Sequence, residues 1–159
     1  MEAQITNSSL IENQNPFALL QSISFLINTN INANKGKSLN DPLFEEIYSL
    51  YSKLFMYSNI SCSTLIISLI YMDKLIQTDA ITVDNTNFPY VITGLMFIAG
   101  KYNDDCFDGN NYSKILGVDI HELVQIEFQL INLLNYSLYV DSDLYNLYSS
   151  NLSKLYSQQ

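Results

Sequence analysis

Residues 65–79 have the sequence LIISLIYMDKLIQTD, an apolar run that ends in the charged pair Asp73-Lys74. Apolar residues recur at steps of three and four, which is the spacing of a helix face. They form one stripe and a neighbouring flank: Leu65, Ile66, Leu69, Ile70, Met72 and Ile76. A helix that is apolar on nearly every side is buried on nearly every side. The pattern therefore predicts a central helix, which Ser61 can cap.

The same helical period continues on both sides of this segment. Proline in a first turn after Asp or Asn marks helix starts near residues 16, 42 and 88. The capping box of Asp119 and Glu122 marks one near 119, and Asp141 to Asp143 mark one near 141. We expect helices from these starts to about residues 27, 57, 102, 134 and 156, and a short turn over 112–116. Glycine and proline number only five and three, which disfavours a β-sandwich or barrel with its many tight turns. The sequence predicts an all-α fold.

Composition limits the classes of partner. The 159 residues carry a net charge of −9, and all seven basic residues are lysine. Such a chain is a poor candidate for binding nucleic acid or acidic lipid. Its apolar runs are too short to span a membrane. The start, MEAQITNSSL, lacks a secretory signal, so we expect a cytoplasmic or nuclear protein with reduced cysteines.

No pattern indicates an enzyme. The lone His121 lies in a first helical turn without a nucleophile nearby in sequence, and is interpreted as solvent-facing. Cys62 and Cys106 lie on different elements, so a zinc site is not expected. The acidic loop 103–111 lacks the bidentate glutamate of a calcium loop. We expect no catalytic residue, no cofactor, no metal and no small-molecule substrate.

Two charged residues lie on flanks where apolar residues dominate. Lys101 follows Phe97 and Ile98, and Glu127 lies among residues ELVQIEFQLINLL. A solvated flank does not normally carry such neighbours. Two interpretations remain open at this stage: a Lys–Glu pair that closes the edge of the core, or a pair that serves a partner. A second pair, Lys53 and Asp73, is interpreted as a partly buried structural ion pair.

Together, these segments resemble a cyclin box. LIISLIYMDKLIQTD (65–79) is similar to the second box helix, NFPYVITGLMFIAGKYNDD (87–105) to the third, and residues 111–140 to the fourth and fifth. The run YSKILGV, followed by the glutamate of IEFQLI, is closest to the P/U-type cyclins of phosphate signalling. The resemblance implies a loose tail over 1–15, a helix and linker over 16–40, a five-helix cyclin box over 41–140 and a C-terminal helix over 141–159.

The resemblance also implies a function. Cyclins bind a cyclin-dependent protein kinase and hold its C-helix so that the kinase's own Lys–Glu pair forms. Carried over position by position, the kinase contacts of the family fall on eight residues: Lys101, Glu127, Ile98, Tyr102, Phe128, Ile131, Tyr136 and Leu138. The internal Arg–Asp bridge of the family falls on Lys53 and Asp73, where lysine makes a weaker bridge because the bidentate fork is lost.

The first box helix departs from the cell-cycle cyclins, because it lacks their MRxxLxxW docking motif and the chain has no tryptophan. Substrate recruitment through that groove is therefore not implied. A cyclin-like adaptor or scaffold for a non-kinase partner is the alternative function, since one fold serves many functions. The Lys101/Glu127 pair distinguishes the two, because a scaffold does not need it.

Overall fold

The computed structural model describes residues 15–32 and 42–157, and each regular element within these ranges is a helix. The prediction of an all-α fold is confirmed. In chain order the helices are α2 (Pro16–Ile31), α3 (Pro42–Tyr57), α4 (Cys62–Gln77), α5 (Phe88–Asn103), α6 (Gly109–Leu116), α7 (Ile120–Leu133) and α8 (Ser142–Ser157).

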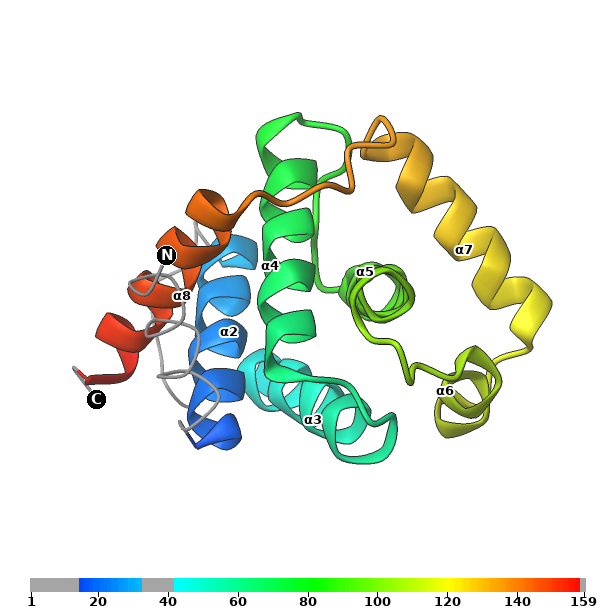
Figure 1. Ribbon diagram of the computed structural model, residues 1–159, viewed down its shortest axis with the longest axis horizontal. Coiled ribbons are helices and arrows are strands. Elements are labelled where there is room, and N and C mark those ends of the chain that lie inside the picture. The colour runs from blue at the N-terminus through cyan, green and yellow to red at the C-terminus, as the bar shows by residue number, and fades with distance from the viewer. Residues whose placement is uncertain (1–14, 33–41, 158–159) are drawn as a thin grey trace.

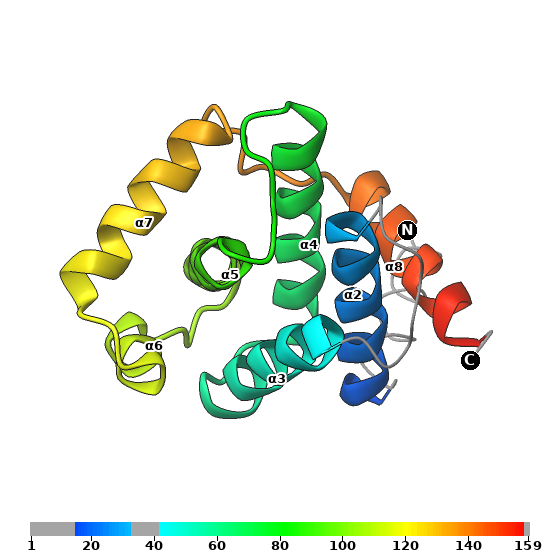
Figure 2. The same cartoon turned by 180° about the vertical axis from the view of Figure 1, so that it is seen from behind.

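Helix α4 lies at the centre of the molecule, as the sequence of residues 65–79 predicts (Figure 1). Its most extensive packing is with α5, which is seen end-on beside it. Helix α7 covers the far side of α5, whereas α2 and α8 cover the opposite side of α4. Helices α3 and α6 close the same end of the bundle (Figure 2). Five helices, α3–α7, thus form the box, and α2 and α8 flank it.

Short polar side chains fix where the helices begin. Ser61 Oγ accepts a hydrogen bond from the backbone N–H of Thr64, and Asp119 Oδ1 accepts one from His121. Each bond satisfies an amide that has no partner inside its helix. The expected cap of α3, Asp41, lies outside the described residues.

Two helices are longer than the sequence pattern indicates. Helix α6 begins at Gly109 rather than Tyr112, because Asp108 Oδ1 accepts hydrogen bonds from the backbone N–H groups of Asn110 and Asn111. Helix α2 continues through Ile31, although its last turn lacks an apolar period. There Thr29 Oγ1 donates to the carbonyl of Phe25, which adds a local bond to the helical ones.

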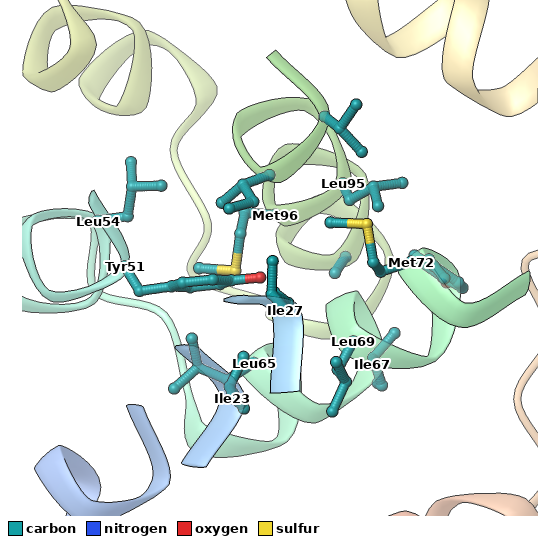
Figure 3. Packing of buried hydrophobic residues seen from close by; sticks show 14 of the residues in the cluster. Ile23, Ile27, Tyr51, Leu54, Leu65, Ile67, Leu69, Met72, Leu95 and Met96 are labelled. Carbon is teal, nitrogen blue, oxygen red and sulfur yellow. The ribbon is translucent and has the colours of Figure 1, made fainter. Parts of the chain in front are cut away.

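The core is one apolar cluster to which α2, α3, α4 and α5 contribute (Figure 3). Its largest fully buried side chains are Tyr51 of α3, Tyr71 of α4 and Tyr112 of α6. Helices α4 and α5 cross steeply, and their buried residues meet at this crossing (Figure 1). Among the described residues, no helix is both long and apolar enough to cross a membrane.

Candidate functional site

Helices α5 and α7 pack closely because Gly94 removes a side chain at their crossing. A Cβ atom at Gly94 would lie 2.3 Å from Leu130 Cδ1 and 2.7 Å from Ile126 Cγ2. Real Cβ atoms do not come this close to other carbons, so any larger residue at position 94 would force the side chains of Leu130 and Ile126 to shift. The close approach brings charged residues from the outer parts of both helices within reach of each other.

Lys101 and Glu127 form an ion pair between α5 and α7. Lys101 Nζ lies 2.8 Å from Glu127 Oε1 and donates a hydrogen bond to Oε2 at 3.0 Å. The Glu127 side chain is only 13% exposed, whereas that of Lys101 is 48% exposed. The ammonium also lies 5.2 Å from the ring centroid of Phe97, within cation–π range. The Lys101 ammonium therefore contacts both the Glu127 carboxylate and the Phe97 ring.

Exposed apolar side chains adjoin this ion pair. Tyr102 follows Lys101 at the end of α5 and is exposed. On α7, Val124 and Phe128 are exposed one turn apart, and Phe128 reaches 62%. Val124 and Phe128 line a shallow pocket together with Gln125 and Gln129. We call the set Lys101, Tyr102, Val124, Glu127, Phe128 and the half-buried Ile131 the α5/α7 surface.

One predicted contact residue is buried instead of exposed. Ile98 is 2% exposed and belongs to the core cluster. Helix α5 lies between α4 and α7, so residues 91–100 are all buried whichever way they face. The expectation that Ile98 contributes to an exposed patch is wrong for this reason.

The chain leaves α7 through a tight turn that presents two further predicted residues. Asn135 and Tyr136 have φ values of 52° and 59°, and the N–H of Ser137 donates to the carbonyl of Leu134 at 3.0 Å. Two successive left-handed residues are the geometry of a type I′ turn. Tyr136 is exposed and Leu138 is half-buried against the core. We call residues 136–139 the 136–139 segment.

Sequence reasoning missed two exposed residues near the predicted ones. Val124 lies one helical turn before Glu127, and the spacing of the sequence places both on one face, but Val124 was not predicted as a contact residue. Tyr139 is exposed at the end of the 136–139 segment. Nothing in its sequence neighbourhood indicates this exposure, because the segment is irregular.

The expected ion pair between Lys53 and Asp73 is not formed among the described residues. Asp73 instead accepts a hydrogen bond from Tyr148 Oη at 2.6 Å. Helix α8 packs on α4 and delivers this hydroxyl, whereas Lys53 is exposed on α3. Burial raises the pKa of Asp73 above its ordinary range, and the Tyr148 bond opposes that shift. The structural partner of Asp73 is thus a tyrosine of a flanking helix.

The acidic loop after α5 has a structural contact. Asp104 accepts hydrogen bonds from the N–H of Ser61 at 3.1 Å and from Thr64 Oγ1 at 2.5 Å. Neighbouring Asn103 donates from its side chain to Thr64 Oγ1 at 3.1 Å. These bonds tie the end of α5, which carries Lys101, to the start of α4. His121 and Cys106 are exposed, and Cys62 is half-buried at the start of α4.

Comparison with known proteins assigns the family. The family model described as Cyclin matches residues 37–138, which is more than half of the chain. The chain belongs to the cyclin family. Cyclins are regulatory proteins that generally have no catalytic activity of their own. The five-helix box seen here, α3–α7, runs from Pro42 to Leu133 and so lies wholly within the matched range.

Similar curated proteins are plant cyclins of the U and P types. Cyclin-U4-2 of Arabidopsis thaliana is 28% identical over 110 residues, covering 68% of this chain and 51% of that protein. Cyclin-P3-1 of Oryza sativa subsp. japonica is 27% identical over 103 residues, covering 64% and 44%. The chain spans about half the length of the curated relatives it matches. These matches confirm the resemblance to the P/U type.

Proposed function

We propose that this cyclin is the regulatory subunit of a cyclin-dependent protein kinase, and that it activates the kinase by holding the C-helix in its active position. The α5/α7 surface is the proposed contact. The observation that carries the proposal is the Lys101–Glu127 ion pair, which lies among exposed apolar residues. The two helices that carry it pack closely at Gly94. Membership of the cyclin family supports the choice of partner.

Activation of the kinase depends on the position of its C-helix. Phosphoryl transfer needs the Lys–Glu pair of the kinase, and that pair is broken while the C-helix is turned outward. A partner that binds only the inward position shifts the population by its difference in affinity for the two positions. Phe128 and Tyr102 offer apolar area for such binding. The preformed ion pair offers charge whose interactions strengthen once the partner excludes water.

The proposal is tested by removing both charges together. In Lys101→Met/Glu127→Gln the side chains keep their approximate shape and neither leaves a buried charge without a partner. We expect the helical circular dichroism to be unchanged. Binding to the matching cyclin-dependent kinase of the source organism should weaken by roughly 2 kcal/mol, about thirtyfold, and kinase activation should fall with it.

Phe128→Ala should act in the same direction, because it removes exposed apolar area from the same surface. His121→Ala is the matched control on α7, since His121 is exposed in the first helical turn away from the ion pair. Full activation by a folded double variant would contradict the proposal. That result would favour the adaptor function, in which the fold binds a partner other than a kinase.

A further inference from the structure

Two side chains of α4 hold three successive backbone carbonyls after α7. Tyr71 Oη donates to the carbonyl of Leu138 at 2.8 Å. Lys74 Nζ donates to the carbonyls of Ser137 and Tyr139 at 3.1 and 3.3 Å. Tyr71 and Lys74 are three residues apart, so they lie on the same face of α4. We call these two side chains and the three carbonyls the carbonyl latch.

The latch is a specific use of a charged residue. Within the described residues Lys74 makes no ion pair, and its ammonium donates hydrogen bonds to backbone oxygens instead. The ammonium also lies 5.9 Å from the ring centroid of Tyr71. Burial lowers the pKa of Lys74, and the negative charge of Asp141 opposes this shift. A half-buried charge needs hydrogen-bond partners, and for Lys74 the backbone carbonyls supply them.

The segment that the latch holds begins in strained backbone. Asn135 and Tyr136 both adopt the left-handed conformation, which asparagine tolerates but which costs a residue such as Tyr136 about 1–2 kcal/mol. Such backbone persists only where the surroundings fix it. In Figure 1 the orange chain after α7 crosses α4 near its C-terminal end, where the latch lies. The bonds from α4 immediately after the turn provide that fixation.

The latch adjoins the α5/α7 surface. Burial raises the pKa of Tyr71, and a smaller contribution comes from the nearby side chain of Tyr102. The backbone gives a direct link, because the N–H of Tyr136 donates at 3.0 Å to the carbonyl of Ile131, a residue of the α5/α7 surface. Tyr136, just before the latched carbonyls, and Tyr139, which carries the last of them, both have exposed side chains. Together they extend the α5/α7 surface by two aromatic groups.

We infer that Tyr71 and Lys74 are positioning residues that fix the 136–139 segment as the rim of the kinase-binding surface, with Tyr139 as a contact residue. This inference rests on the proposed function. Neither Tyr71 nor Lys74 touches the partner in this account. Each acts by holding the backbone that presents Tyr136 and Tyr139.

The first test needs no kinase. Lys74→Met keeps the stem and removes the ammonium, and Tyr71→Phe removes only the hydroxyl. Hydrogen exchange of the free protein, read by mass spectrometry, should become faster in the peptide that contains residues 135–139. Lys74→Arg should exchange as slowly as the wild type, because guanidinium also donates to carbonyls. Lys53→Met, at an exposed lysine of α3, should leave exchange unchanged.

The second test measures the dissociation constant for the kinase. Lys74→Met should weaken binding roughly tenfold, and Lys74→Arg should recover it. Combined with Tyr139→Ala, Lys74→Met should add little, since both remove the same contact. Combined with the double variant of Lys101 and Glu127, its effect should add in full.

Unchanged exchange in Lys74→Met would overturn the latch. Faster exchange with unchanged kinase affinity would overturn the positioning role, while the effect of the Lys101/Glu127 variant would keep the proposed function intact. If that variant also left binding unchanged, the proposed function and the positioning role would both fall. Faster exchange in Lys74→Met would then show only that the latch orders the 136–139 segment of the free protein.

Discussion

At the scale of single residues, Asp73 depends on a neighbour from a flanking helix. Its carboxylate lies partly buried on α4 and accepts the Tyr148 hydroxyl from α8. A buried acceptor that loses its donor leaves its desolvation uncompensated. Burial raises the pKa of the Tyr148 hydroxyl, and the adjacent Asp73 raises it further, so the hydroxyl remains a donor. The contact ties α8 to the box.

Tyr148→Phe removes that donor and keeps the ring. We expect the free energy of unfolding to fall by about 1–2 kcal/mol, since Asp73 is only partly buried. Urea titration followed by circular dichroism measures the change. Lys53→Met should stay within about 0.5 kcal/mol of the wild type, as exposed substitutions do. A larger loss for Lys53→Met than for Tyr148→Phe would restore the ion pair expected from the sequence.

At the scale of elements, the spacing of α5 and α7 decides whether the Lys101–Glu127 pair forms. Gly94 sets that spacing, because Leu130 and Ile126 occupy the place of its missing side chain. Both helices also carry core residues at this crossing, so a shift of α7 disturbs packing as well as the ion pair.

Gly94→Ala should therefore lower the free energy of unfolding by about 1–3 kcal/mol, the usual effect of overpacking, even though alanine favours helix. Thermal unfolding checks the value. In Gly94→Ala/Leu130→Ala the combined loss should be smaller than the sum of the single losses, because the smaller side chain makes room. Additive losses would show that the two residues do not compete for one space.

Helix positions were predictable from the sequence because capping residues and apolar periods are local signals. Ser61 and Asp119 cap where expected, and the central place of α4 follows from its apolar sides. The Lys101–Glu127 contact was predictable through the family resemblance together with its apolar flanks.

The burial of Ile98 and the partner of Asp73 were not predictable in the same way. Periodicity gives the faces of one helix, but it does not say which neighbours cover them. Ile98 is covered by tertiary packing around α5, and Asp73 is met by Tyr148, which lies 75 residues later in the chain. Tyr139 belongs to an irregular segment whose path depends on side chains of α4.

At the scale of the whole molecule, the two sides of the central helix have different roles in this account. Helices α2 and α8 cover one side of α4, whereas α5 and α7 carry the proposed partner surface on the other (Figure 1). The chain carries a net charge of −9 and no arginine, so apolar area and one ion pair, rather than a basic patch, define this surface. Exposed aromatic residues of this kind are typical of interaction sites.

The central claim is that the α5/α7 surface contacts the C-helix of a cyclin-dependent kinase, and photo-crosslinking tests it most directly. A benzoylphenylalanine at position 128 replaces an exposed Phe of α7, and one at position 147 replaces an exposed Leu of α8 as the control. We predict that the probe at 128 joins a peptide of the kinase C-helix and that the probe at 147 joins none. Crosslinks from position 147 alone, or from position 128 to kinase peptides remote from the C-helix, would contradict the account.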